Sequence, residues 1–126
     1  MVLTGRGSRR YVLYSWAKAS DHQWLYEDTP PHLVYSVDHG HFLGDGGPRW
    51  TVQDLQAQPS ATWDGTFAPC KLTDIELAAP LARLQSVTKA DVEAIVAGPR
   101  PDWSVTLEER AALADYLFRR KLDLVP

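Results

Sequence analysis

The chain has 126 residues, which is enough for one domain with a sizeable core and too short for two ordinary domains. Its 44% hydrophobic and 23% charged residues exclude the composition of disordered chains, and its net charge of −3 excludes a global basic field that would attract nucleic acid or an anionic membrane. The single cysteine, Cys70, cannot form an internal disulfide, and no targeting segment or membrane-spanning apolar run is evident, so the sequence predicts a cytoplasmic protein.

The first part of the chain is predicted to contain a helix, a loop and a strand. Apolar residues recur at helical spacing over residues 9–18, which predicts a short amphipathic helix that leads into a loop at Asp21. Residues 33–37 form a β-prone run that follows two prolines and ends at Asp38, as is typical of a buried strand. The interval between Asp21 and Asp38 leaves room for a loop and a tight two-stranded ribbon.

The middle of the chain is predicted to be irregular and then helical. Residues 44–69 are rich in Gly, Pro, Asp and Thr, which indicates an irregular surface stretch with one short helix over residues 52–58. Residues 73–87 follow a helical pattern, and Pro80 is expected to kink or split this helix because proline removes a backbone donor.

Two helix-start boxes predict the C-terminal helices. Thr88 precedes Asp91, and Thr106 precedes Glu109, at the spacing at which a hydroxyl and a carboxylate satisfy the first free backbone amides. The last helix begins with acids and ends with bases at residues 119–121, an order that stabilises a helix dipole and predicts no further role for these bases. The expected fold class is α+β, mainly helical, with a small β ribbon on a helical platform.

Asp21 and Asp38 have the positions that a phosphoryl-transfer site requires. Such a site needs one carboxylate to orient the attacking hydroxyl and a second to hold Mg²⁺ against the phosphates. Asp21 is predicted in a loop after a helix and Asp38 at the end of a strand, so both lie at the ends of elements. Their spacing suits a single site.

Residues 34–44 read Val-Tyr-Ser-Val-Asp-His-Gly-His-Phe-Leu-Gly and contain the pattern Asp-x-Gly-His-Phe. Through this pattern, the segment around Asp38 resembles the metal-binding loop of phosphatidylinositol 3/4-kinases and their bacterial HipA-like relatives. The resemblance implies that Asp38 binds the metal ion and, with Gly40, contributes to the nucleotide site. Gly40 is expected to let the backbone turn sharply beside Asp38.

Residues 16–26 resemble the catalytic segment of some small HipA-like proteins, which has an Asp-x-Gln-Trp-Leu arrangement. The matched stretch runs over residues 16–50, and the resemblance implies that Asp21 is the catalytic-loop aspartate. The chain departs from the usual Asp-x-x-x-x-Asn loop because Tyr26 stands where the metal-binding Asn would be. Our hypothesis is that the amide oxygen of Gln23, two residues beyond Asp21, replaces it as a metal ligand in the catalytic loop.

The resemblance as a whole implies the C-terminal lobe of a HipA-like kinase. Such a lobe would take part in ATP- and Mg²⁺-dependent phosphoryl transfer to the hydroxyl of a protein or small molecule. No glycine-rich phosphate loop or strand lysine precedes the matched segment, so the nucleotide-covering N-terminal lobe is expected to be missing. The expected partners are a nucleotide, the acceptor and a separate N-lobe, and the chain alone is not expected to be a complete kinase.

Two other functions remain open from the sequence. The chain could be an inactive kinase remnant whose C-terminal helices bind a partner. It could instead be a metal-dependent hydrolase with His39, His41 and Asp38 as ligands. The three histidines His22, His39 and His41 with Asp21 and Asp38 could also form a transition-metal site of the kind found in hydrolases or oxygenases, although a bare His-x-His is a weak signal. Without the family pattern, Asp38 and the residues after it would also suit an ordinary polar turn.

Overall fold

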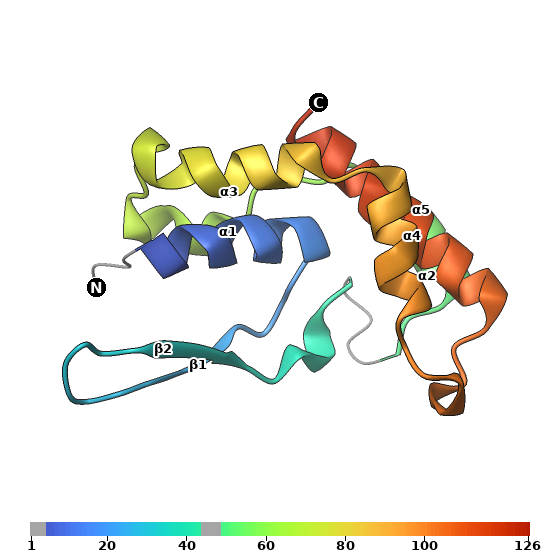
Figure 1. The fold of residues 1–126 in the computed structure, drawn as a ribbon, viewed down its shortest axis with the longest axis horizontal. Helices are drawn as coiled ribbons and strands as arrows, with labels where there is room; N and C mark the ends of the chain where they lie inside the picture. Colours follow the sequence, from blue (N-terminus) through green and yellow to red (C-terminus); the bar gives the residue numbers. More distant parts are fainter. Residues whose placement is uncertain (1–4, 44–48) are drawn as a thin grey trace.

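The computed structural model describes residues 5–43 and 49–126 (Figure 1). Its α-helices, strands and 3-10 helices are, in chain order, α1 (Gly5–Ala17), β1 (Gln23–Tyr26), β2 (Val34–Val37), η1 (His39–His41), α2 (Val52–Ala57), η2 (Gly65–Cys70), α3 (Asp74–Ser86), α4 (Lys89–Ala97), η3 (Pro101–Trp103) and α5 (Leu107–Leu124). The expected fold class, α+β and mainly helical, is confirmed. Gly44, the last residue of the motif around Asp38, lies outside the described residues.

The helices form the body of the molecule, and the two strands form a ribbon beside it. Helix α1 packs along α3 and also contacts α5, while α2 and α4 both pack against α5 (Figure 1). Strands β1 and β2 are antiparallel and make a two-stranded sheet that lies below α1 in this view. No helix in the described parts of the chain is both long and apolar enough to cross a membrane.

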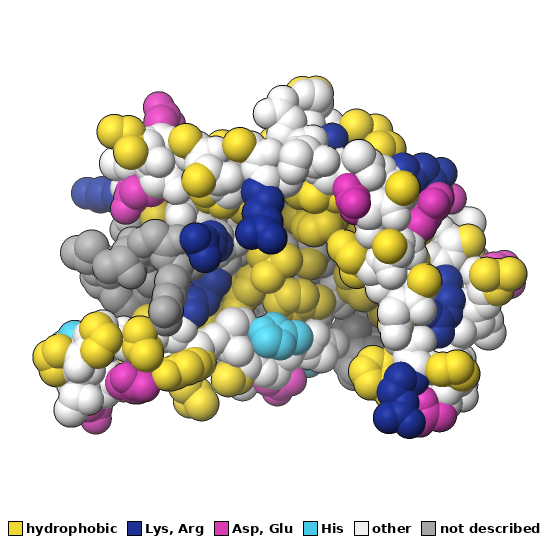
Figure 2. Space-filling view, viewed as in Figure 1, with side chains coloured by type: hydrophobic (Ala, Val, Ile, Leu, Met, Phe, Trp, Pro, Cys, Tyr) yellow, Lys and Arg dark blue, Asp and Glu magenta, His cyan; other side chains and the backbone are white. Residues whose placement is uncertain are grey.

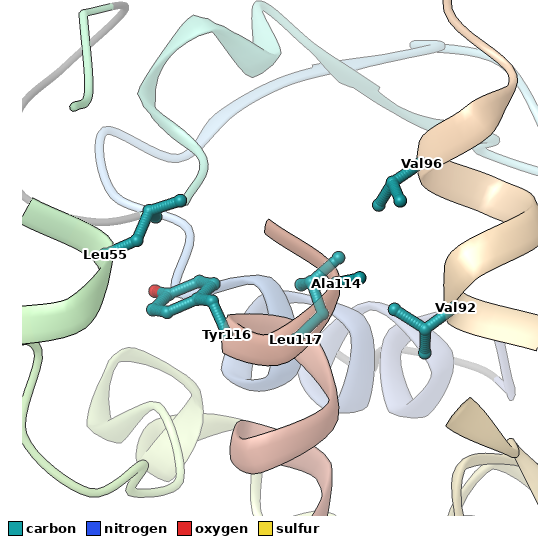
Figure 3. Packing of buried hydrophobic residues seen from close by; sticks show 6 residues of the cluster. All are labelled: Leu55, Val92, Val96, Ala114, Tyr116 and Leu117. Atoms are coloured by element: carbon teal, nitrogen blue, oxygen red, sulfur yellow. The ribbon is translucent and has the colours of Figure 1, made fainter. Parts of the chain in front are cut away.

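The main core lies where α2, α4 and α5 meet. Figure 3 shows that its side chains point toward one another from these three helices: Leu55, Val92, Val96, Ala114, Tyr116 and Leu117. Val92 is fully buried, so α4 cannot leave α5 without exposing a complete apolar side chain. A second cluster joins α1 to α3 and α5 through Val12, Leu84 and Leu124. These two clusters fix α1, the helix that leads into the ribbon.

Capping boxes start four of the helices. The two predicted boxes, at Thr88 and Thr106, are confirmed, and the same Thr-x-x-acid signal also starts α2 at Thr51 and α3 at Thr73. In each box the Thr hydroxyl accepts a bond from the backbone N–H three residues later, and the carboxylate there accepts from the Thr backbone N–H. These bonds, together with bonds from the hydroxyls, lower the pKa of the carboxyls of three acids, Asp54, Glu76 and Asp91.

Three details of the fold differ from the sequence predictions. Helix α1 begins at Gly5 rather than near residue 9, because the small residues Gly7 and Ser8 are buried and tertiary packing extends the helix. Helix α3 is not split at Pro80, because the leucines before and after the proline pack in one cluster with α1. Strand β2 is not buried, because a ribbon of two strands cannot cover both of its faces, and Tyr35 is 46% exposed.

Arg120 has a role that the sequence analysis did not predict. The side chain is only 4% exposed, and burial lowers the pKa of its guanidinium. Its Nε donates to the carbonyl of Trp16 at 2.7 Å and its Nη2 to that of Ser15 at 2.6 Å. These carbonyls lie in the last turn of α1, where the helix dipole is negative, so Arg120 on α5 caps α1.

Candidate functional site

The register of the ribbon brings the two candidate aspartates to the same end. Strand β1 pairs with β2 so that Gln23, the first residue of β1, lies opposite Val37, the last residue of β2. Asp21 precedes β1 by two residues and Asp38 follows β2 directly. An antiparallel pair therefore places the loop before its first strand next to the loop after its second strand.

The amide of Gln23 lies between the two carboxylates. Its Nε2 donates to Oδ2 of Asp21 at 3.2 Å and to Oδ2 of Asp38 at 3.4 Å, which is a long contact. The Nε2 of His41 lies 4.0 Å from Oδ2 of Asp21. The structure thus gathers Asp21, Gln23 and Asp38, with His41 at the edge of the group. The side chains of Asp21, Gln23 and Asp38 are exposed, so a ligand can reach them from solvent.

The backbone is in the left-handed region at both aspartates. The φ angle is 51° at Asp21 and 53° at Asp38, a conformation that Asp adopts more readily than most residues. Gly40 instead lies within η1, and its φ is outside the left-handed region. A methyl group at Gly40 would meet Oδ1 of Asp38 at 3.5 Å, which is an ordinary contact. The prediction that Gly40 makes the sharp turn is therefore wrong, because Asp38 itself makes it.

Backbone hydrogen bonds tie the two loops together at the site. The N–H and hydroxyl of Ser20 both donate to the carbonyl of His41, at 2.9 and 3.1 Å. The N–H of Leu43 donates to the carbonyl of Ala17 at 2.8 Å. The chain before Asp21 and the chain after Asp38 are thus joined directly, which holds the relative positions of the two carboxylates.

Tyr14 on α1 anchors both strands of the ribbon. Its buried hydroxyl accepts a bond from Trp24 Nε1 in β1 at 3.1 Å and forms a hydrogen bond with the hydroxyl of Ser36 in β2. Ser36 in turn bonds His39 Nε2 at 2.7 Å. The guanidinium of Arg10 donates to the carbonyl of Val34. Sequence reasoning missed Tyr14 and Ser36, and no local motif marks them, because their role depends on the packing of α1 against the ribbon.

His22 lies between the candidate residues Asp21 and Gln23 in the sequence, and its ring contacts different partners. Its Nε2 lies 2.7 Å from Oδ2 of Asp64, and the imidazole packs against the rings of Tyr14 and Phe67. The pKa of the neighbouring Tyr11 hydroxyl is raised, mainly by its own burial and also by the negative charge of Asp64. His22 therefore joins the loop before β1 to Asp64, the residue that precedes η2.

The alternative site of His and Asp ligands does not form among the described residues. His22 is paired with Asp64, and His39 bonds Ser36. In residues 5–43 and 49–126, no group of three or more His, Cys, Asp or Glu side chains is placed to hold a metal ion. The geometry thus gives no support to a hydrolase centre of Asp38, His39 and His41.

The donors that do come together suit magnesium. Mg²⁺ prefers oxygen ligands and is usually held by one or two carboxylates, with phosphate oxygens and water completing its coordination. Asp21 and Asp38 supply two carboxylates, and rotation of the Gln23 side-chain amide would turn an oxygen toward them in place of the nitrogen. Asp21, Asp38 and Gln23 are therefore the residues here that could hold a Mg²⁺ ion.

Comparisons with known proteins found no match to this chain among family models, curated proteins or solved structures.

Proposed function

We propose that this chain is the C-terminal lobe of a HipA-like kinase and takes part in the transfer of a phosphoryl group from ATP to a protein or small-molecule hydroxyl. The observation that supports this proposal is the position of the Gln23 amide between Asp21 and Asp38. It joins the aspartate of the candidate catalytic loop to that of the candidate metal loop. A phosphoryl-transfer site needs two such carboxylates, with different roles, in one place.

In this proposal each residue of the site has its own role in phosphoryl transfer. Asp21 would orient the acceptor hydroxyl and take up its proton as the oxygen bonds to the γ-phosphorus of ATP, while the bond from that phosphorus to the β–γ bridging oxygen breaks and ADP leaves. The exposed position of Asp21 leaves access for the acceptor. Asp38 and the amide oxygen of Gln23 would hold Mg²⁺, which supplies charge neutralisation at the phosphates. The hydrogen bonds from Ser20 to the carbonyl of His41 join the two loops that carry these carboxylates.

The position of Tyr26 supports Gln23 as the replacement for the usual Asn. In the ribbon, Tyr26 pairs with Val34, which is the opposite end from the Gln23 and Val37 pair. Gln23 is the amide that reaches both carboxylates.

Calorimetry of Mg²⁺-dependent ATP binding tests this function. We would compare the chain, its Asp38→Asn variant and a version extended by an N-lobe, either encoded upstream or supplied as a separate protein. We expect ATP to bind in the extended protein and to lose affinity on Asp38→Asn, because a neutral amide holds Mg²⁺ less well than a carboxylate. Asp28→Asn is the matched control, since Asp28 is exposed in the turn at the far end of the ribbon.

The outcome also separates the proposal from the inactive remnant. Binding that depends on Asp38 but not on Asp28 supports a kinase lobe that needs its partner lobe. Equal loss in both variants would show only a general effect of charge. No ATP binding in any form, with the variants folded by circular dichroism, would overturn the proposal and favour an interaction module.

A further inference from the structure

An apolar groove lies where α1, α3 and α4 meet. It has a volume of about 530 Å³, and no residue of the proposed phosphoryl-transfer site lines it. Figure 2 shows hydrophobic side chains gathered in a hollow between these helices, with basic side chains at its edge. The apolar residues on which the argument rests are Val12, Leu13, Trp16, Leu84, Val87 and Ile95.

The groove is an open trough with a fixed wall. Leu13 is 47% exposed and Ile95 59% exposed, whereas an enclosed small-molecule pocket would bury most of its ligand and its lining. Trp16 is held in place because its Nε1 donates to the carbonyl of Leu117 at 2.8 Å. A surface of this kind, preformed and open along its length, suits a segment of another protein.

The walls of the groove favour a helix as the bound segment. Residues 9, 12, 13 and 16 line it from α1, and residues 80, 83 and 84 line it from α3, with Val87 directly after that helix, so each wall is one helical face. The backbone groups of both helices are bonded within the helices, and neither wall offers a free strand edge. An extended peptide therefore cannot add as a strand, while the apolar side of an amphipathic helix can lie in the trough.

Two arginines at the groove indicate the charge of the partner. Arg9 on α1 and Arg83 on α3 line it from its two walls, and both are exposed. Within the part of the chain that the structure describes, neither forms an ion pair with a carboxylate. By contrast, Arg110 and Arg120 donate to backbone carbonyls. The two free guanidiniums are thus complementary to acidic groups that flank an apolar face.

We propose that this groove binds an amphipathic helix of another protein, with an apolar face flanked by Asp or Glu. The apolar residues of that helix fill the trough beside Trp16, and its carboxylates pair with Arg9 and Arg83. The proposal is independent of phosphoryl transfer, because the lining of the groove includes neither Asp21 nor Asp38.

The test uses two synthetic helical peptides and fluorescence anisotropy. Both peptides have Leu at positions i, i+3, i+4 and i+7, and the flanking residues are Glu in one and Lys in the other. We expect the Glu peptide to bind the full chain about tenfold more tightly at low salt, since two rim ion pairs and the removed repulsions together amount to roughly 1.4 kcal/mol. The Arg9→Glu, Arg83→Glu double variant should reverse this preference.

The controls separate the groove from general charge and from self-association. The double variant Arg49→Glu, Arg100→Glu changes the net charge by the same amount at exposed positions outside the groove and should keep the preference. Leu13→Asp should weaken both peptides while circular dichroism shows a folded chain. Failure of both peptides to bind, or equal binding that neither double variant changes, would overturn the proposal. So would sedimentation showing a dimer that Leu13→Asp dissociates, because a second copy would then occupy the groove.

Discussion

At the residue scale, the sharp turn after β2 falls on Asp38, where φ is 53°, and not on Gly40. We expect Gly40→Ala to change the free energy of unfolding by less than about 0.5 kcal/mol, because its methyl group meets only an ordinary contact. Asp38→Val should cost about 1 to 2 kcal/mol, because a β-branched residue is poorly tolerated in the left-handed region. Urea unfolding measures both values.

These two variants also test the role of Gly40 in the nucleotide site. If Gly40→Ala keeps its stability but loses ATP affinity in the extended protein, Gly40 is needed for close approach of the phosphates. If Gly40→Ala unfolds the chain as much as Asp38→Val does, the assignment of the turn to Asp38 is contradicted.

Gln23 is the second residue on which the site depends. Because its amide lies within hydrogen-bonding distance of both carboxylates, Gln23→Ala should weaken metal binding about tenfold. Paramagnetic Mn²⁺ in place of Mg²⁺ allows a measurement without nucleotide, from the broadening of the amide signals of Asp21 and Asp38 in NMR spectra. Gln85→Ala, at an exposed position on α3, is the matched control. Unchanged metal affinity in Gln23→Ala would contradict the hypothesis that Gln23 replaces the usual Asn.

At the element scale, Arg120 joins α5 to the end of α1, the helix that leads into the site. Arg120→Met should lower the free energy of unfolding by about 3 kcal/mol, because two charge-assisted bonds to carbonyls in the last turn of α1 are lost. Arg120→Lys should rescue little of this loss, since an ammonium lacks the planar fork that reaches both carbonyls. Chemical denaturation measures the change.

The neighbouring Arg119 provides the control for this prediction. Arg119 is exposed and donates once, to the carbonyl of Leu55 at 2.9 Å, so Arg119→Met should cost clearly less than Arg120→Met. Equal losses in the two variants would show that the cap on α1 does not matter for stability.

At the scale of the whole molecule, the capping boxes make stability depend on acid. The pKa values of Asp54, Glu76 and Asp91 are lowered in the folded chain, so the unfolded chain takes up protons first as the pH falls. Their contribution to stability is therefore complete above about pH 5 and is lost as the pH falls through about 4 and below. Urea unfolding between neutral and acidic pH measures this loss.

A triple variant tests whether the carboxylates of the capping boxes cause this loss of stability at acidic pH. Asp54→Asn, Glu76→Gln and Asp91→Asn together remove the three titrating groups and should flatten the dependence of stability on pH in this range. A dependence as steep as that of the unchanged chain would assign acid sensitivity to other carboxylates.

The sequence by itself determined the starts of α4 and α5 and the room for a ribbon between Asp21 and Asp38, because these features depend on neighbours along the chain. A Thr followed three residues later by an acid favours the start of a helix, and α4 and α5 begin directly after Thr88 and Thr106 as predicted. The sequence also named Asp21, Gln23 and Asp38 as one candidate site. Their spacing allows a ribbon, and the structure has that ribbon.

Only the tertiary structure decided the features that join distant segments. Tyr14 anchors the ribbon and Arg120 caps α1 through bonds between parts of the chain that no local pattern relates. The course of α3 past Pro80 and the apolar groove both depend on how α1 lies against α3. Local hydrogen bonds set where α2, α3, α4 and α5 begin, but burial of side chains against one another sets how the helices meet, and burial is a property of the whole fold.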